Sequence, residues 1–145
     1  MKDNYPKLLV LFQFTLWGLI MLFSKGFFGS FLSMTIFILG SWLGIWALLH
    51  NRVGNFNVQP KMKEGAELIT SGIYAYIRHP MYLSVILMNF AFVVCHITFF
   101  QITLFLALII VLFLKAKREE SLWLEENLKY AEYKRSTKLF LPFLL

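Results

Sequence analysis

The sequence predicts an all-α integral membrane protein, a bundle of four transmembrane helices followed by an interfacial C-terminal helix on the cytoplasmic side. Three observations predict this class. Of the 145 residues, 59% are hydrophobic and only 15% are charged, with a mean hydropathy of +0.66, whereas a soluble domain has about 25% charged residues. Long charge-free segments interrupt the chain, and the basic residues gather in the parts between them. The length is that of one domain, which we expect to cover 1–145.

The charge-free segments locate the predicted spans. Segments 8–24, 26–51 and 79–114 carry no Lys, Arg, Asp or Glu and are 17, 26 and 36 residues long. Because about 20 apolar residues cross a bilayer, the first two each predict one helix and the third predicts two short ones. His96, Thr98 and Gln101 interrupt the third apolar run. We therefore expect spans at about 7–24, 29–50, 80–96 and 99–116.

The distribution of basic residues predicts the orientation. Four spans place both termini, the loop 51–79 and the tail 117–145 on one side. With Lys7 and Lys115 at the ends of their spans, that side carries 13 of the 14 Lys and Arg residues, leaving Lys25 opposite. The positive-inside rule makes this side cytoplasmic. No small-residue cleavage site follows the first apolar run, so we expect a retained span and not a signal peptide.

The net charge of +6 would suggest nucleic acid on a soluble protein. Here the basic residues serve topology, so we expect the lipid bilayer as a partner and no nucleic acid. The single cysteine, Cys95, excludes an internal disulfide and a cysteine-built zinc site, and no metal is expected. The sequence leaves the oligomeric state open.

Two polar segments hold the groups that chemistry requires. The loop 51–79 is longer than a simple connection and contains apolar residues that argue against disorder. In the tail, 12 of the 24 residues from 115 to 138 are charged. Its Trp and Tyr side chains suit the depth of the lipid headgroups, so we expect a helix that emerges from the fourth span and lies near the interface.

The densest group of candidate residues precedes the third span. Pro80 suits the first turn of a helix and keeps His79 out of the helical region, so the span is expected to begin at Pro80. A helix N-terminus attracts anions such as a carboxylate, with Arg78 as a cation and His79 as a donor or base. Aromatic faces come from Tyr74, Tyr76 and Tyr82. The alternative is an ordinary interface belt with Arg78 on lipid phosphate.

Arg118-Glu119-Glu120 follows directly on the fourth span. Two acids at this depth oppose the negative charge of the cytoplasmic leaflet, which favours a specific role. The alternative is a solvated helix face with pairs such as Glu125 and Lys129.

Together these segments resemble a known family. Leu-Ile-Thr-Ser-Gly-Ile-Tyr-Ala-Tyr-Ile-Arg-His-Pro-Met-Tyr, residues 68–82, resembles the L-V-T-x-G-x-Y-x-x-x-R-H-P-x-Y signature of the isoprenylcysteine carboxyl methyltransferases and related phospholipid N-methyltransferases. Arg118-Glu119-Glu120, with Tyr130, Tyr133 and Pro142 downstream, resembles the tail of the same family. The resemblance extends from Asn55 to Pro142.

The resemblance implies a methyltransferase that binds S-adenosylmethionine in a cytoplasm-facing pocket between loop and tail. The methyl acceptor is then lipidic or amphipathic: an isoprenylcysteine-type carboxylate, a phospholipid amine or a thiol. Residues carried over as cofactor contacts are Gln59, Ala66, Glu67, Leu68, Ile69, Tyr74, His79, Pro80, Met81 and Tyr82, with Glu119 or Glu120. Residues carried over to the reaction or the acceptor side are Arg78, His79, Lys115 and Arg118.

The chain also departs from the family pattern. Ala66 stands where relatives have a histidine, Lys115 where the isoprenylcysteine enzymes have an arginine, and Asn127-Leu128 where they have Phe-Gly. These changes affect the acceptor side more than the cofactor side, so the sequence leaves the acceptor open. Two other functions remain as alternatives: a non-catalytic membrane scaffold, and an NADPH-dependent protein like the sterol reductases, which have additional spans.

Overall fold

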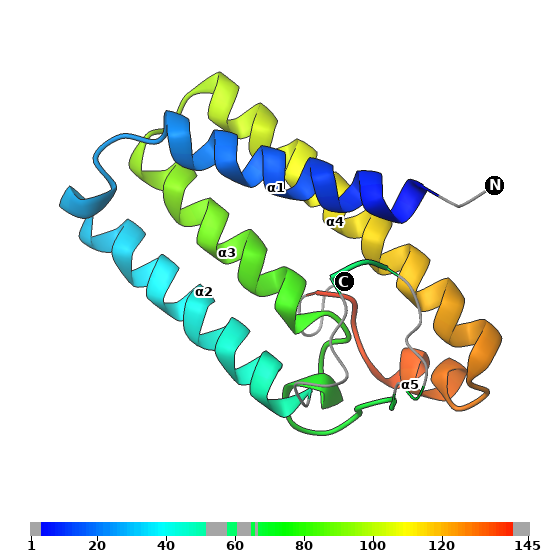
Figure 1. Ribbon diagram of the computed structural model, residues 1–145. Coiled ribbons are helices and arrows are strands. Elements are labelled where there is room, and N and C mark those ends of the chain that lie inside the picture. Colours follow the sequence, from blue (N-terminus) through cyan, green and yellow to red (C-terminus); the bar gives the residue numbers. More distant parts are fainter. Residues whose placement is uncertain (1–3, 52–57, 61–64, 66, 141–145) are drawn as a thin grey trace.

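The computed structural model describes residues 4–51, 58–60, 65 and 67–140. Across these residues the elements are helical (Figure 1). They are α1 (Tyr5–Phe23), α2 (Phe31–His50), α3 (Pro80–Cys95), α4 (Phe99–Glu126) and α5 (Tyr130–Ser136), with 3-10 turns η1 (Phe27–Gly29) and η2 (Gly72–Ala75). The predicted all-α class is confirmed. Ala66, Pro142 and the basic residues Arg52, Lys61 and Lys63 lie outside the described residues.

Helices occur at all four predicted span positions. α1, α2 and α4 are long and apolar enough to cross a membrane, and α3 is a shorter apolar helix of 16 residues. The surface of the bundle carries exposed apolar side chains, among them Leu22, Phe31, Ile38, Trp42 and Ile110. Exposed apolar surface on this scale suits lipid and not water, and the chain is an integral membrane protein.

Local sequence explains where the helices begin. Pro6 and Pro80 occupy the first turns of α1 and α3, where a missing N–H costs nothing. The side chain of Ser30 accepts the Ser33 N–H at 3.2 Å to start α2, and Thr98 accepts the Gln101 N–H at 3.1 Å to start α4. The predicted break near residues 96–100 is therefore an N-cap at Thr98.

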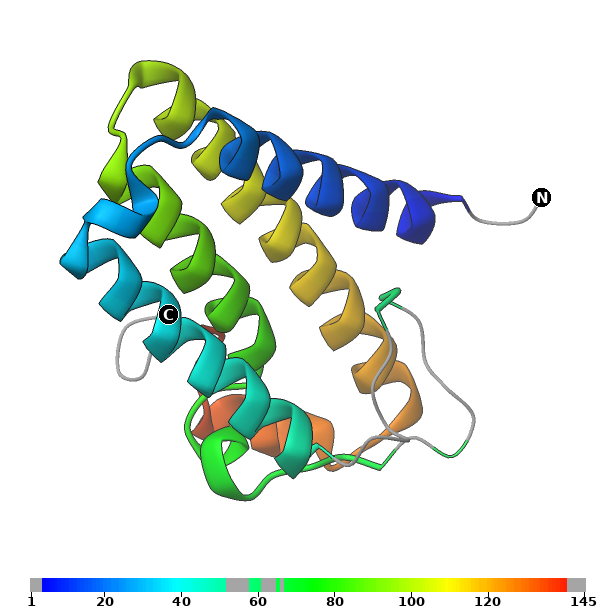
Figure 2. The ribbon, with the colours of Figure 1, turned by 60° about the vertical axis from the view of Figure 1, so that its left-hand side comes forward.

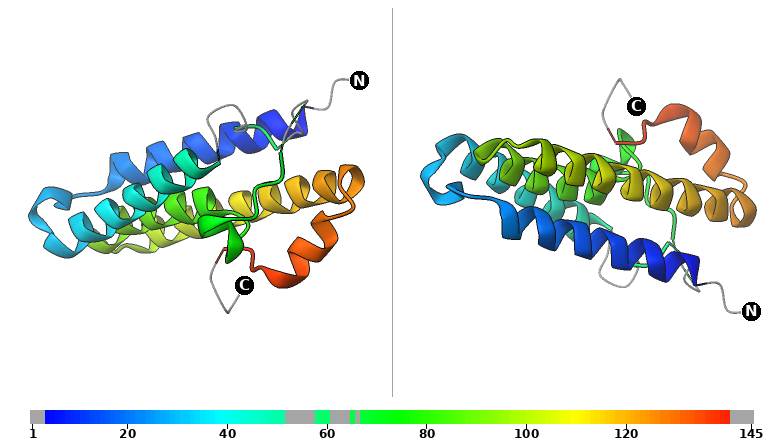
Figure 3. Two further views of the ribbon diagram at one scale, coloured as in Figure 1. Left: turned by 90° about the horizontal axis from the view of Figure 1, so that it is seen from below. Right: turned by 90° about the horizontal axis from the view of Figure 1, so that it is seen from above.

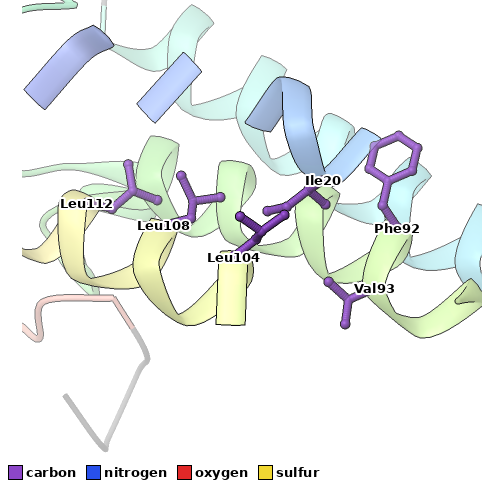
Figure 4. Close-up of a cluster of buried hydrophobic side chains, with 6 residues drawn as sticks. All are labelled: Ile20, Phe92, Val93, Leu104, Leu108 and Leu112. Carbon is purple, nitrogen blue, oxygen red and sulfur yellow. The ribbon is translucent and has the colours of Figure 1, made fainter. Parts of the chain in front are cut away.

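The bundle is built from two antiparallel helix pairs. Figure 2 shows α2 beside α3 and α1 beside α4, and α3 also packs on α4 and α1. α2 and α3 approach closely because Gly40 and Gly44 face α3, where Ser84 Oγ donates a 2.7 Å hydrogen bond to the Gly40 carbonyl. The buried core holds Ile20, Phe92, Val93, Leu104, Leu108 and Leu112 (Figure 4).

The tail differs from its expected form in one respect. The predicted emerging helix is present as the continuation of α4 to Glu126, but it ends at Asn127 and a second helix, α5, folds back (Figure 3). Asn127 causes the break because it adopts an extended conformation and its side chain accepts the Lys129 N–H at 3.0 Å. The tail thereby returns to the start of α3.

Candidate functional site

Backbone pairing joins the segment before α3 to the tail. Ile77 and Lys138 form a parallel bridge, the Arg78 N–H donates to the Lys138 carbonyl at 2.8 Å, and the His79 N–H donates to the Leu139 carbonyl at 3.1 Å. The Lys138 N–H donates back to the Tyr76 carbonyl at 3.1 Å. The residues that precede Pro80 are thus fixed between the tail and the first turn of α3.

α4 supplies the polar side of the site. Its buried residues recur every three or four positions along one face: Gln101, Leu104, Leu108, Leu112, Lys115, Ala116 and Glu120. The face changes from apolar to polar at Lys115, and its polar end meets the start of α3. Two predicted residues, Lys115 and Glu120, are therefore buried because they continue the core-facing stripe.

Glu120 lies in a buried ion-pair cluster with Arg78 and Lys134. Arg78 Nε lies 2.6 Å from Glu120 Oε1, and Lys134 Nζ lies 2.9 Å from Glu120 Oε2. The Glu120 side chain is 1% exposed and the Arg78 side chain 8%. Arg78 Nη1 also donates to the carbonyl of Lys134 at 3.1 Å and to the carbonyl of Thr137. Arg78 therefore binds both α4 and the C-terminal end of α5.

Glu119 belongs to a second group with His79 and Tyr82. The Tyr82 hydroxyl donates to Glu119 Oε1, and His79 Nδ1 lies 3.5 Å from Glu119 Oε2. The His79 and Tyr82 rings stack with centroids 5.3 Å apart, and Phe140 packs edge-on against both rings. The Glu119 side chain is 23% exposed, so this carboxylate reaches the surface where that of Glu120 does not.

The two carboxylates set the charge state of His79. Burial would lower the pKa of His79, but the nearby carboxylates of Glu119 and Glu120 outweigh burial and raise the pKa above its ordinary value. Within the described residues, nothing hydrogen-bonds the buried Nε2 atom of His79, and Glu120 Oε1 lies 3.8 Å from it. His79 is thus a buried donor with capacity for a further partner.

Lys115 borders this second group on the side of α1. The side chain is 1% exposed, its Nζ atom donates to Gln13 Oε1, and the same atom lies 5.2 Å from the centroid of the Tyr82 ring. Tyr82 therefore contacts Lys115 with its ring face and Glu119 with its hydroxyl. The cation and the partly exposed carboxylate lie one helical turn apart on α4.

An open cleft of about 700 Å³ lies between the segment 67–75 and the tail. Its lining from the first segment is Glu67, Leu68, Thr70 and Ala75, and its lining from the tail is Asn127, Lys129, Glu132, Tyr133, Ser136 and Thr137. Thr137 also accepts from Arg78, and the Tyr133 hydroxyl donates to the Tyr74 carbonyl at 2.7 Å. The cleft thus adjoins the ion-pair cluster.

Most of the predicted site residues lie in the cluster or along the cleft, and the others lie apart from both. Arg78, His79, Pro80, Tyr82, Lys115, Glu119 and Glu120 gather at the start of α3 and the polar end of α4, while Glu67 and Leu68 line the cleft. Tyr74 is the buried residue of η2, and its hydroxyl donates to the Ala47 carbonyl at 3.4 Å. Three other predicted cofactor contacts lie outside both this cluster and the cleft lining. They are Gln59, Ile69 and Met81, and all three are half-buried. Arg118 instead lies over the Tyr5 ring, at 5.4 Å.

Sequence reasoning missed several residues that contact the candidate residues, among them Gln13, Lys134 and Thr137. Gln13 carries a recognisable signal, because it falls on the same face of α1 as Leu9 and Ile20 and is a polar residue within an apolar span. Lys134 and Thr137 carry no such signal. Their places depend on the reversal of the chain at Asn127.

Comparison with known protein families finds a match. A family model described as the isoprenylcysteine carboxyl methyltransferase (ICMT) family matches residues 32–126, which is more than half of the chain. The matched segment includes the start of α3 and the polar end of α4, whereas α1 and α5 lie outside it. No curated protein matches the chain.

Proposed function

This chain belongs to the isoprenylcysteine carboxyl methyltransferase family of membrane methyltransferases, and from that premise we propose that it uses S-adenosylmethionine to methylate a lipidic or amphipathic acceptor. One observation carries the proposal: His79 and Tyr82 at the start of α3 meet the partly exposed carboxylate of Glu119. This arrangement joins aromatic faces, a carboxylate and a helix N-terminus at the polar end of a membrane bundle.

The residues present fit a donor that carries a sulfonium, an amino group, a carboxylate and ribose hydroxyls. Glu119 offers a partly exposed carboxylate to the amine or the hydroxyls. The N-terminus of α3 attracts the donor carboxylate. The Nε2 atom of His79, which hydrogen-bonds none of the described residues, supplies a further hydrogen-bonding atom.

Arg78 and Glu120 have a different role in this proposal. Both side chains are occupied by protein groups, so we assign them to positioning the site and not to contact with the donor. Glu119 is then the acidic residue that contacts the donor. The cleft beside Glu67 and Leu68 provides space for the nucleoside part of the donor.

When bound, S-adenosylmethionine supplies a methyl group on a positively charged sulfur, for an in-line displacement in which an acceptor lone pair bonds the methyl carbon as the C–S bond breaks. The residues of the chain contribute mainly orientation and exclusion of water. Tyr82 and Phe140 cover His79, and this cover shields the reacting groups from solvent. A carboxylate acceptor needs no base, whereas an amine or thiol must give up a proton, for which His79 or Glu119 is the candidate acceptor.

We also propose that the site faces the cytoplasm. Contacts between Arg118 and Tyr5, Tyr74 and Ala47, and Arg78 and Glu120 bring the start of α1, the end of α2, the start of α3 and the end of α4 to one end of the bundle. Most of the basic residues lie at this end in sequence. A cysteine placed at Ser136 in a Cys95→Ser background should react with a membrane-impermeant maleimide only after cells are opened; reaction on intact cells contradicts this orientation.

Calorimetry on the purified protein in nanodiscs tests the function. We expect S-adenosylmethionine to bind and NADPH not to bind, and transfer of labelled methyl to total membrane lipid should give a labelled lipid product. Glu119→Gln should weaken donor binding, whereas Glu125→Gln, the same change at an exposed position of α4, should not. Binding of NADPH alone would favour a reductase, and binding of neither ligand would favour a scaffold; both results overturn the proposal.

A further inference from the structure

The end of the bundle away from the candidate site is apolar even where the chain turns. The turn between α1 and α2, which contains η1, and the turn between α3 and α4 both lie at this end (Figure 1). Phe28, Phe31 and Phe99 are 87%, 86% and 88% exposed there, and Ile97 is 70% exposed. We call these four side chains the apolar tip. Exposed apolar surface of this kind marks a site of interaction.

The polar side chains of the two turns bond within the chain. Ser24 Oγ donates to a carbonyl of α1 at 3.0 Å, and His96 Nδ1 lies 3.1 Å from the Phe23 carbonyl. Ser30 and Thr98 accept backbone N–H groups at the starts of α2 and α4. Away from water, polar groups must find partners in the protein. These turns thus direct polar atoms toward the chain and aromatic rings toward the surroundings.

Three helices give the bundle the same apolar length. From Lys7 to Phe23 on α1 and from Phe99 to Lys115 on α4 the chain rises about 24 Å, and α3, with 16 residues, is equally long. The hydrocarbon core of a bilayer is about 30 Å thick. The helices alone are therefore about 6 Å too short to cross it. The side chains of the apolar tip extend the apolar surface at the end where this length is missing.

The residue types at this end suit acyl chains. Residues 18–41 and 83–122 contain no Trp or Tyr, the types whose polar groups favour the membrane interface. Lys25 is the one Lys, Arg, Asp or Glu residue in 8–51, and 79–114 contains none. A lysine extends its ammonium on a long apolar stem and reaches the headgroups from below them. A single cation among phenylalanines therefore fits a lipid with an anionic phosphate.

We propose that the apolar tip inserts among the acyl chains of the leaflet at this end and that Lys25 contacts the lipid phosphates above it. The occupant of this surface is lipid and not a second copy of the chain, since the surface continues the lipid-facing sides of the helices. Leu22 and Leu32, beside the turn, are 73% and 59% exposed. The tip thereby supplies the apolar length that the helices lack and sets the depth of the bundle. This role does not depend on the proposed methyltransferase function.

The depth of the tip is measured with nitroxide labels on the full chain in phosphatidylcholine vesicles. Phe28→Cys and Phe99→Cys are each made in a Cys95→Ser background. Leu106→Cys is the lipid-facing reference within α4, and Ser136→Cys is the reference in water. We expect a polar nickel complex to collide with the labels at 28 and 99 about ten-fold or more slowly than with the label at 136, because polar molecules enter hydrocarbon poorly. Oxygen should collide with them as often as with the label at 106.

Two outcomes overturn the proposal. Nickel collision rates at 28 and 99 equal to the rate at 136 place the tip in water. Low collision rates with both reagents, together with spin–spin broadening between labels, show that a second copy of the chain covers the tip. Lys25→Leu separates the role of the cation: without its contact to phosphate the turn should lie deeper, so the nickel collision rate at 28 should fall further. An unchanged rate contradicts the role of Lys25.

Bilayer thickness provides a second measurement. Phe28→Ser/Phe99→Ser shortens the apolar length of the bundle, so its melting temperature should be highest in vesicles with shorter acyl chains than those that suit the wild type. Phe28→Leu/Phe99→Leu keeps the apolar surface and is the matched control, which should prefer the same chain length as the wild type. A serine variant with the wild-type preference contradicts the proposal, since the tip would then add nothing to the length that the bilayer covers.

Discussion

Replacing Arg78 with methionine should release the tail from the rest of the bundle. Arg78 contacts Glu120 on α4 through Nε and the Lys134 and Thr137 carbonyls at the end of α5 through Nη1. Methionine keeps much of the volume of the side chain but removes every donor. The variant leaves a buried carboxylate short of its main partner and leaves two carbonyls of α5 without their cation.

The size of the effect follows from the burial of the pair. Removing one partner of a buried ion pair costs about 3–5 kcal/mol, because the other charge stays buried. Lys134 remains 2.9 Å from Glu120, and its side chain is 34% exposed, so it offsets part of the loss. We therefore expect about 3 kcal/mol, the lower end of that range. The loss should destabilise the segment that Arg78 joins to α4. This segment includes α5 and the residues around the Ile77–Lys138 bridge.

Hydrogen exchange followed by mass spectrometry measures this release directly. A loss of about 3 kcal/mol corresponds to a roughly 100-fold fall in the protection of backbone amides. We expect that fall at residues 130–140 and unchanged protection in α2. Arg135→Met, at an exposed position of α5, is the matched control and should keep wild-type protection. Arg78→Met/Glu120→Leu should be closer to wild type than Arg78→Met. Equal protection in Arg78→Met and wild type would refute the idea that Arg78 holds the tail against α4.

Three further outcomes are expected. Glu119→Gln should weaken binding of S-adenosylmethionine by about 1–3 kcal/mol in calorimetry, and Glu120→Gln should instead lower the melting temperature; the reverse pattern contradicts our division of the two acids. Because the folded-state pKa of His79 is raised above 6.5, its stabilisation is complete below pH 6.5 and is lost as pH rises through the folded-state pKa. The melting temperature should fall over that window in wild type, and an equal fall in His79→Gln would show that another group is responsible. Gly44→Ala should destabilise the folded protein by about 1–3 kcal/mol, since the new methyl collides with Ser84 Oγ. Adding Ser84→Ala should recover part of the loss. A Gly44→Ala variant with full wild-type stability would contradict close packing between α2 and α3 at this position.

The helices and part of the site were predictable because their signals are local. Pro80 marks the start of α3, and Thr98 caps α4 where the polar residues interrupt the apolar run. The family signature brought Arg78 and His79 to notice as candidates. The resemblance also implied a pocket between the loop and the tail, but the tail was predicted as a single helix. The break at Asn127 depends on one side-chain hydrogen bond to Lys129, which competes with the helix only weakly.

The partners of the candidate residues were not predictable, since they depend on contacts between segments distant in sequence. Arg78 meets Lys134 and Thr137 only after the chain reverses at Asn127. Gln13 meets Lys115 only after α1 and α4 pack side by side. Each helix nevertheless shows its half of the contact as a polar residue on the buried face. A polar residue on an otherwise apolar helix face predicts that its side chain is buried. It does not predict which partner the side chain meets.

The two adjacent glutamates show why one of a pair is available to a ligand and the other is not. Neighbouring residues on a helix point about 100° apart, so both cannot lie on the same face. Glu120 continues the stripe of Leu108, Leu112 and Ala116 at intervals of four, and it is buried with Arg78 and Lys134. Glu119 faces the edge of that stripe, where Tyr82 and His79 hold it and solvent still reaches it. A carboxylate that fixes the fold must be buried and paired, and one that receives a ligand must remain accessible. The doubled acid at the membrane boundary meets both requirements because the helix turns between its two residues.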